Sequence, residues 1–161
     1  MFRVGIGYDV HAFAPHGSGR RLLLGGVVME GAPGLEGHSD ADVLIHSICD
    51  AVLGALGLGD LGRHFPDSDP ELKGVSSLVL LQKVGALMSG RGYRLINIDA
   101  VVIAQTPKIA AATSEMKRLI AGALGATEAE INIKGTSPEG LGALGRTEGI
   151  AAESIALIGK I

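Results

Sequence analysis

The stretch HSDADVLIHSICDAVLGALGLGD, residues 38–60, predicts a helix that carries polar side chains along one stripe of an apolar surface. Ser39 and Asp42 have the spacing of a capping box, which predicts a helix start at this point. Gly57 and Gly59 indicate where the helix ends, because glycine is common just beyond a helix C-terminus.

Three titratable residues, Asp42, His46 and Asp50, are spaced four apart and therefore share one side of this helix. Such groups are costly to bury among Val, Leu, Ile and Ala unless they are paired or bind a metal. Simpler roles stay open for each of them. Asp42 could only cap the helix, Asp50 could be a surface carboxylate or a hydrogen-bond anchor, and His46 could be a hydrogen-bonded core histidine.

A second polar group follows the first predicted strand, in GYDVHAF, residues 7–13. Side chains two apart in a strand point the same way, so Asp9 and His11 project together. An Asp-x-His pair at a strand end is by itself more often a surface turn. Together with His46, however, the pair supplies two imidazoles and a carboxylate, the ligand set of a catalytic zinc ion with an open fourth position. Manganese or cobalt would fit the same ligands less well.

The start of the predicted helix indicates a place for phosphate beside this metal. His38 and Ser39 lie where the backbone N–H groups of a helix N-terminus attract an anion. The residues alone therefore predict a metal–phosphate site.

Composition narrows the class of protein. The chain has 161 residues, of which 47% are hydrophobic and 19% charged, so we expect one folded domain over 1–161. A net charge of -3, 3% aromatic residues and no Trp argue against a nucleic-acid partner or an anionic membrane surface. The single cysteine, Cys49, fits a reducing compartment, and the opening MFRVGIGYD does not resemble a secretory signal. We therefore expect a cytoplasmic protein without a membrane span.

Strands and helices alternate along the rest of the chain, which predicts an α/β-type domain. One strand, residues 93–105, should present Ile96, Ile98, Ala100 and Val102 on one face. Thr106 and Pro107 predict the start of a helix that ends at Gly125. The expected strands are residues 2–10, 20–29 (broken at Gly25–Gly26), 93–105, 130–135 and 149–161, and the expected helices are 38–60, 75–92 and 106–125.

Several stretches resemble one family in order and spacing: GYDVHAF, LGGV, GHSDADVLIHSICDAVLGALGLGDLGRHFPDSDP, VIAQTPK and INIKGTSPEGLGALGRTEGIAAE. The family is 2-C-methyl-D-erythritol 2,4-cyclodiphosphate synthase, of the non-mevalonate route to isoprenoid precursors. The resemblance runs from residue 3 almost to the C-terminus. It implies an α+β sandwich with a mixed sheet and helices on one face. It also implies a cyclic homotrimer with the sheets toward the threefold axis.

The resemblance also implies roles for the residues near the strand end and the first helix. Asp9, His11 and His46 match the zinc ligands, and His38 and Ser39 match residues that contact the substrate phosphate. The matches to the binding site of the methylerythritol end are Val10, Asp60, Leu61, Gly62, Phe65, Pro66, Asp67, Ser68 and Asp69.

Two further segments match the binding site of the nucleotide. The matches to the cytidine pocket are Ala104, Gln105, Thr106, Pro107, Lys108, Ile109 and Ala110, and those to the diphosphate loop are Thr136, Ser137, Pro138 and Glu139. Glu139 would bind a second divalent ion, Mg²⁺ or Mn²⁺, and His38 and Ser137 would act as catalytic residues that stabilise charge on the reacting phosphorus.

The last loop departs from the family pattern. The family usually has a threonine pair, of which Ser137 keeps a hydroxyl. Pro138 stiffens the loop, and Ala143 stands where an aromatic residue is common. Arg146 and Glu153 match a charged pair near the threefold axis. The loss of the aromatic residue affects the lining of the threefold cavity rather than the reacting groups.

The implied reaction converts 4-diphosphocytidyl-2-C-methyl-D-erythritol 2-phosphate into 2-C-methyl-D-erythritol 2,4-cyclodiphosphate and CMP. The enzyme would be a metal-dependent phosphorus–oxygen lyase. Two other classes share the zinc ligands. A zinc-dependent phosphoesterase would use a metal-bound water as nucleophile, and a zinc-stabilised trimer without activity would need neither Lys108 nor Ser137.

Overall fold

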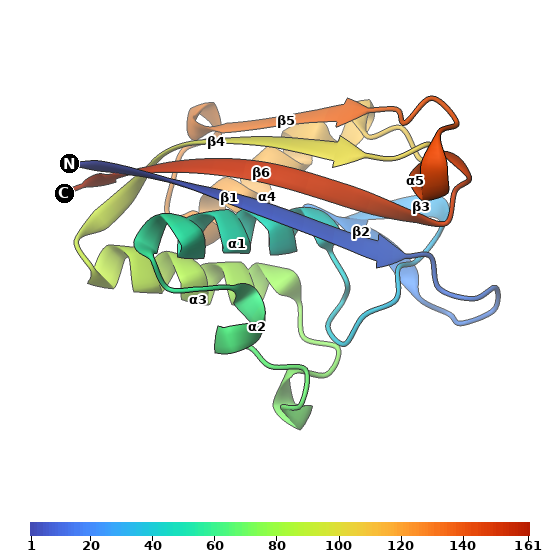
Figure 1. The fold of residues 1–161 in the computed structure, drawn as a ribbon, viewed down its shortest axis with the longest axis horizontal. Coiled ribbons are helices and arrows are strands. Elements are labelled where there is room, and N and C mark those ends of the chain that lie inside the picture. Colours follow the sequence, from blue (N-terminus) through green and yellow to red (C-terminus); the bar gives the residue numbers. More distant parts are fainter.

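The computed structural model describes residues 1–161, which form a four-stranded sheet, a separate two-stranded hairpin and a layer of helices (Figure 1). The strands are β1 (Phe2–Ala12), β2 (Arg21–Leu24), β3 (Val27–Pro33), β4 (Tyr93–Ile103), β5 (Ile131–Thr136) and β6 (Gly149–Lys160). The helices are α1 (Val43–Leu56), α2 (Leu61–His64), α3 (Ser77–Gly90), α4 (Thr113–Leu124) and α5 (Gly142–Gly145), with single 3₁₀ turns η1 (Pro70–Leu72), η2 (Ala110–Ala112) and η3 (Glu128–Glu130). All these helices are too short to span a bilayer.

The sheet is mixed and has the strand order β1-β6-β4-β5. Strand β6 is antiparallel to both of its neighbours, whereas β4 and β5 run parallel. Helix α1 packs on β1 and β6, α4 packs on β5, and α3 lies against α1 and α4. Figure 1 shows these three helices on the same side of the sheet. The predicted fold class, a mixed sheet with helices on one face, is therefore confirmed.

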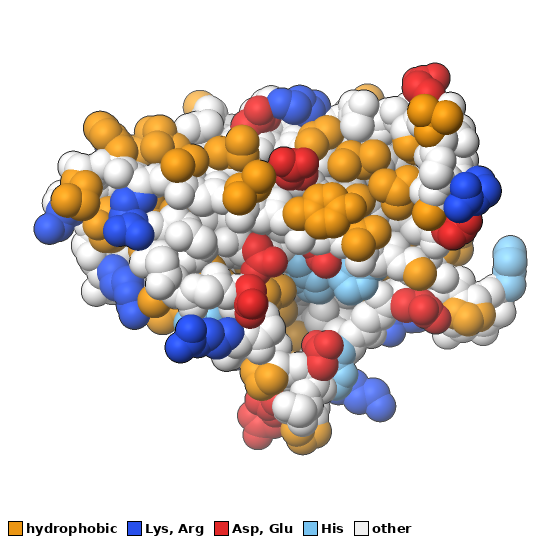
Figure 2. Space-filling view, viewed as in Figure 1, with side chains coloured by type: hydrophobic (Ala, Val, Ile, Leu, Met, Phe, Trp, Pro, Cys, Tyr) orange, Lys and Arg blue, Asp and Glu red, His pale blue; other side chains and the backbone are white.

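The other face of the sheet carries uncovered apolar side chains, which Figure 2 shows gathered over the strands. Side chains along a strand alternate between faces, so β1 turns one set toward α1 and the other set outward. Phe2 and Tyr8 are 70% and 55% exposed on this outer face. The other exposed large apolar residues of β1 and β6 are Val4, Ile6, Val10 and Ile155. A contiguous apolar surface of this kind is typical of an interaction site.

The turn between β2 and β3 is anchored to the start of α1. Gly25 and Gly26 both have positive φ, 59° and 80°, so the predicted break at these glycines is a tight hairpin turn. Their backbone N–H groups donate to the carboxylate of Asp42, at 2.9 and 2.6 Å. The same carboxylate accepts from the N–H of Ile45 at 3.1 Å, so Asp42 is the N-cap of α1.

The predicted capping box of Ser39 and Asp42 is therefore wrong, because α1 begins at Val43 rather than near Ser39. Asp42 is fully buried, and burial raises its pKa although the backbone N–H groups oppose this effect. Gly57 does end the helix, in a left-handed conformation with φ of 73°.

Two other predictions are wrong, one of a helix start and one of the buried face of a strand. The helix expected from Thr106 begins at Thr113, because residues 104–110 instead follow the wall of a cavity described below. In β4 the register shifts between Leu95 and Asn97, which places Leu95 rather than Ile96 in the core. Ile98, Ala100 and Val102 are buried as expected.

Candidate active site

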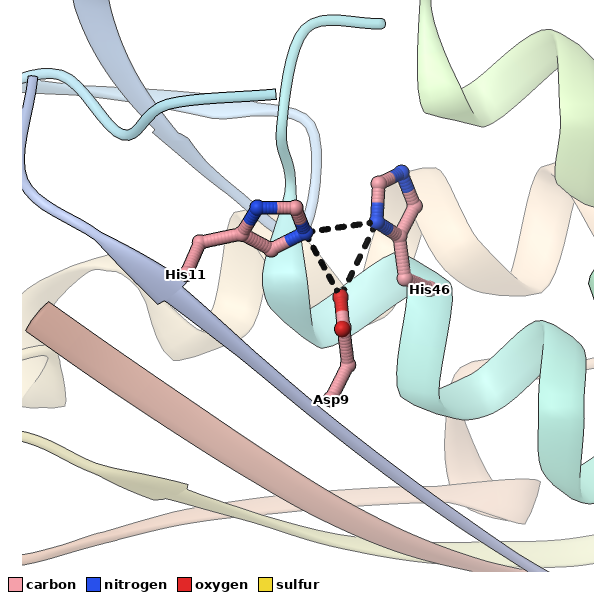
Figure 3. Close-up of side chains that lie close together, drawn as sticks. All are labelled: Asp9, His11 and His46. Atoms are coloured by element: carbon pink, nitrogen blue, oxygen red, sulfur yellow. Dashed lines mark hydrogen bonds and ion pairs between the residues drawn. The ribbon is translucent and has the colours of Figure 1, made fainter. Parts of the chain in front are cut away.

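Asp9, His11 and His46 point toward one another at the edge of the sheet, where β1 passes the first turn of α1 (Figure 3). Oδ2 of Asp9 lies 3.0 Å from Nε2 of His11 and 3.0 Å from Nδ1 of His46. The two ring nitrogens are 3.3 Å apart. Ligands about 2.0 Å from a tetrahedral zinc ion lie about 3.3 Å from one another, so the three atoms have nearly the spacing that a metal requires. These residues could hold a metal ion.

The partners of both histidines favour metal binding. Nδ1 of His11 donates to the carbonyl oxygen of Glu36 at 2.5 Å, which leaves the lone pair of Nε2 facing the site. Nε2 of His46 lies near the hydroxyl groups of Ser39 and Ser77, while its Nδ1 faces Asp9.

The electrostatics of the group suit a cation. Burial opposes ionisation of Asp9, but hydrogen bonds from His11 and His46 outweigh it and lower the pKa of Asp9 well below its ordinary value. The hydrogen bond to Asp9 also raises the pKa of His11, while burial opposes this rise. A positive charge beside this carboxylate is therefore favoured, whether it comes from a metal ion or from a proton on the His11 imidazole.

A cavity of about 430 Å³ opens beside this group and collects most of the residues expected at the phosphate and methylerythritol end. Figure 2 shows acidic and histidine side chains around a hollow below the apolar face. The cavity is lined by Asp9, His11, Gly37, His38, Ser39, His46, Asp50, Asp60, Leu61, Gly62, Phe65 and Asp67.

Four of the expected residues do not line this cavity. Val10 is half exposed on the opposite face of β1, because neighbouring side chains of a strand alternate. Pro66, Ser68 and Asp69 lie in the loop before η1, where the carbonyl of Asp69 accepts from Nε2 of His38 at 3.2 Å.

Asp50 is a residue that the sequence left open and the structure places at the cavity. Its carboxylate accepts from the N–H of Leu61 at 2.6 Å, so it anchors the start of α2. Burial raises the pKa of Asp50, and the nearby carboxylates of Asp60 and Asp9 add to this rise. The reading of Asp50 as a hydrogen-bond anchor is therefore confirmed.

A second cavity, of about 310 Å³, lies between β4, β5 and the segment before α4. It collects most of the residues expected to bind cytidine. The lining consists of Val102, Ala104, Pro107, Lys108, Ile109, Ala110, Thr113, Ile133, Lys134, Gly135, Thr136 and Ser137.

The remaining expected nucleotide residues flank this cavity. Oε1 of Gln105 accepts from the N–H of Gly140 at 3.0 Å and so joins the two loops. Glu139 has a φ of 53°, in the left-handed region, and its N–H donates to Oγ of Ser137 at 3.0 Å. Thr106 and Pro138 lie in the same two loops but outside the lining.

The remaining expected residues lie in the last loop and in the strand that follows it. Ala143 lies in α5, and Arg146 directly after it pairs with Glu148 at 2.7 Å. Glu153 lies in β6, opposite Tyr8 of β1. Within one chain, Arg146 therefore has a different partner from the one that the resemblance implies.

The two cavities lie at opposite edges of the sheet. The first adjoins β1 and the second adjoins β5, which are the outer strands of the order β1-β6-β4-β5. Three strand spacings of about 4.8 Å separate these edges by roughly 14 Å. Within one chain, His38 and Ser137 therefore line different cavities.

Comparison with known proteins decides the family. The YgbB family matches residues 2–159. The chain belongs to this family. A 2-C-methyl-D-erythritol 2,4-cyclodiphosphate synthase of Desulfosudis oleivorans is 53% identical over 156 residues, which cover 97% of this chain and 91% of that protein. The predicted resemblance to these synthases is thus confirmed.

Longer relatives and solved structures agree with this assignment. A bifunctional IspD/IspF enzyme of Anaeromyxobacter dehalogenans is 58% identical over 154 residues, but the match covers 96% of this chain and only 39% of that enzyme. The chain thus spans about two fifths of the bifunctional relative. The structure of Plasmodium falciparum IspF in complex with CDP has a TM-score of 0.86 and 33% identity, covering 99% of this chain and 96% of that one.

Sequence reasoning missed several residues of the two sites. Asp40 and Ser77 contact each other and Ser77 contacts His46, yet 31 positions separate Ser77 from His46, so no local pattern could connect them. Gly37 packs against the His11 ring, where a Cβ would lie 3.2 Å from Cε1. Lys134 also lines the second cavity. Its place in β5, next to Gly135, is the signal that could have identified it.

Proposed function

We propose that this chain converts 4-diphosphocytidyl-2-C-methyl-D-erythritol 2-phosphate into 2-C-methyl-D-erythritol 2,4-cyclodiphosphate and CMP, as part of isoprenoid precursor synthesis in the cytoplasm. The observation that carries the proposal is the Asp9–His11–His46 group beside a cavity, in a chain of the YgbB family. Residues 1–161 would act as one catalytic domain.

The reaction is an intramolecular displacement at phosphorus. An oxygen of the 2-phosphate attacks the β-phosphorus of the cytidine diphosphate, and the bond from that phosphorus to the CMP oxygen breaks. A phosphate oxygen is already anionic, so no serine, cysteine or strong base is required. The protein must align the two phosphates and neutralise their charge.

We assign the metal to Asp9, His11 and His46, which fit Zn²⁺ in ligand type and spacing. A zinc ion bound there would act as a Lewis acid and as a template for the diphosphate. Glu139 would bind a second divalent ion, Mg²⁺ or Mn²⁺, together with phosphate oxygens, which are the hard ligands that these ions prefer.

The chain's own residues would bind the substrate in two parts. His38 and Ser39 would contact the 2-phosphate, and the first cavity would bind the methylerythritol carbons. Lys108 and Ser137 lie in the second cavity, where an ammonium group and a hydroxyl would neutralise the nucleotide diphosphate.

We further propose that the active site forms between two chains of a homotrimer. The two cavities lie at opposite edges of the sheet, so a neighbouring chain would supply the cytidine side of each site. The apolar face that includes Phe2 and Tyr8 would line the threefold axis, where burial would remove it from water.

Phosphorus NMR of the protein with the cytidylated phosphosubstrate, Zn²⁺ and Mg²⁺ tests the proposal. A cyclic diphosphate and CMP support the synthase. Inorganic phosphate or a linear monophosphate would instead indicate a zinc-dependent phosphoesterase. An unchanged spectrum, with zinc bound and the protein folded, would indicate a structural zinc protein.

A further inference from the structure

We propose that Asp40 and Ser77 are positioning residues that hold the His46 ring in the form able to bind a metal through Nδ1. The inference rests on the proposed metal site, and it assigns a role to two residues outside the ligand set. Ser77 contacts Nε2, on the side of the ring that faces away from Asp9, and Asp40 contacts Ser77.

The hydroxyl of Ser77 and the carboxylate of Asp40 form a hydrogen-bonded chain behind the ring. Oγ of Ser77 lies 2.9 Å from Nε2 of His46. The hydroxyl of Ser77 donates to Oδ1 of Asp40, and the Ser77 N–H donates to Oδ2 of Asp40 at 2.8 Å. Ser77 is fully buried, and His46 is 9% exposed, so water does not compete strongly for these bonds.

The direction of the hydrogen bonds follows from what each group can donate. A carboxylate only accepts, so the single hydroxyl proton of Ser77 points to Asp40. The lone pairs of the same hydroxyl then face Nε2 and can accept the ring proton there. In the metal-free protein Asp9 competes for this proton at Nδ1, but once a metal binds Nδ1 the neutral ring carries its one N–H at Nε2, toward Ser77.

Ser39 also lies near Nε2, but it does not fix the ring in the same way. Its Oγ is 3.1 Å from Nε2 and accepts from the N–H of Ala41 at 3.3 Å. No carboxylate fixes the direction of its hydroxyl proton. We therefore expect Ser39 to contribute less to the orientation of His46 than Ser77 does.

Asp40 links the hydroxyl that faces His46 to the start of helix α3. Ser77 is the first residue of α3, and the preceding Ser76 makes no side-chain capping bond. Asp40, 37 positions away, accepts the N–H of Ser77 instead. The same carboxylate thus holds the start of α3 and the hydroxyl that faces His46, so the packing of α3 sets the position of the ring.

The test measures zinc affinity by competition with a chromophoric chelator, in the full chain. Ser77→Ala keeps the backbone bond to Asp40 and removes only the hydroxyl. We expect it to weaken zinc binding by roughly 10-fold or more, as is typical when a partner of a ligating histidine is lost. Asp40→Asn should weaken it by a similar factor, because the amide offers one oxygen in place of the two that accept the hydroxyl and the N–H of Ser77.

Ser47→Ala is the matched control, and Ser39→Ala shows how much zinc affinity depends on the other hydroxyl near Nε2. The Ser47 hydroxyl is buried and bonds Leu44 and Ser154 but not His46, so its loss should leave zinc affinity unchanged. Ser39→Ala should cost less affinity than Ser77→Ala. The loss in the Asp40→Asn, Ser77→Ala double variant should be smaller than the product of the single losses, because both act through one chain of bonds.

A second measurement separates positioning from stability. The ¹⁵N shifts of the His46 ring, in zinc-loaded protein at about pH 8, report which nitrogen binds the metal and which carries the proton. We expect Nδ1 bound to zinc and Nε2 protonated in the parent, and a smaller fraction of this form in Ser77→Ala.

Four results would overturn the inference: parental zinc affinity in folded Ser77→Ala, parental affinity in folded Asp40→Asn, an unchanged ring form in Ser77→Ala, or losses that multiply fully in the double variant. A parent that binds no zinc would instead refute the proposed metal site itself.

Discussion

Gly7 of β1 lies directly against the backbone of α1, where a Cβ at position 7 would be only 2.0 Å from the carbonyl oxygen of Ser47. Gly5 makes the same approach to Ala51, also at 2.0 Å. This contact brings the end of β1 beside the first turns of α1. It therefore determines the distance between the metal ligands of the strand and the one on the helix.

Gly7→Ala should destabilise the protein and weaken zinc binding together. The neighbouring atom belongs to a helix backbone and cannot turn aside, so β1 must move away from α1. We expect a loss of about 2 kcal/mol or more in the free energy of unfolding, as for other overpacked cores. Urea denaturation and chelator competition would measure the two effects.

Gly54→Ala is the control for this prediction. Gly54 also faces β1, but a Cβ there would meet its nearest atom, the Ile6 carbonyl oxygen, at an ordinary 3.7 Å. Alanine favours helix more than glycine does, so this variant should be at least as stable as the parent. Equal stability of the Gly7 and Gly54 variants would show that the close approach does not constrain the site.

The metal group could be predicted from the sequence because each of its parts obeys a local rule. Strand alternation sets Asp9 beside His11, and the polar stripe of the helix singles out His46. The role of Asp42 could not be predicted in the same way. Its carboxylate accepts from Gly25 and Gly26, and a hairpin 16 positions away leaves no trace in the helix pattern.

The secondary structure of the segment beside the second cavity was harder to predict from the sequence. Thr106 and Pro107 have the residue types of a helix start, yet the chain continues to Thr113 before α4 begins. The N–H of Ala104 donates to the carbonyl of Thr136 at 3.1 Å, so β5 holds the segment that leads into the cavity. Tertiary pairing here overrides a local helix signal.

His46→Ala should abolish tight zinc binding and turnover while leaving the fold intact. Removal of one of three ligands should cost more than the roughly 10- to 100-fold lost when a residue behind a ligand is changed. Metal analysis after dialysis, with circular dichroism as a check of folding, would measure this. His16→Ala, at an exposed position away from both cavities, is the control. Full activity in a zinc-free His46→Ala protein would refute the zinc assignment.

Zinc affinity should fall as the pH drops through the histidine range. Zinc binds the neutral imidazole, so protons compete with the metal. The hydrogen bond that His11 donates to Asp9 raises the pKa of His11 in the metal-free protein, so this competition begins at a higher pH than for an ordinary histidine, whose pKa is about 6.5. Chelator competition between about pH 8 and 5 tests whether zinc affinity falls with the pH as expected. Constant affinity over this range would contradict the assignment of His11 as a ligand.

The second cavity should favour cytidine over uridine. The segment 104–110 passes from the end of β4 toward η2 and lines the cavity, so its backbone groups would face a base bound there from one side. Cytosine and uracil differ in the donor and acceptor at two adjacent ring positions, and a mismatch leaves buried polar groups unpaired. We expect kcat/KM to be at least about tenfold higher for the cytidine substrate. Equal values for its uridine analogue would show that this segment does not distinguish the base.

A mixture of two inactive variants should regain activity if each active site is shared between chains. His46→Ala disables the metal side and Lys108→Ala the nucleotide side, and these residues line cavities at opposite edges of the sheet. Each variant alone should be nearly inactive. When the two are unfolded and refolded together, about a quarter of the interfaces in a cyclic trimer should combine an intact metal side with an intact nucleotide side. The mixture should therefore recover up to about a quarter of parental activity, measured as CMP release. Variants refolded separately and then mixed without exchange are the control. If mixed trimers, verified by mass spectrometry, stay as inactive as their parents, both sides of the site belong to one chain.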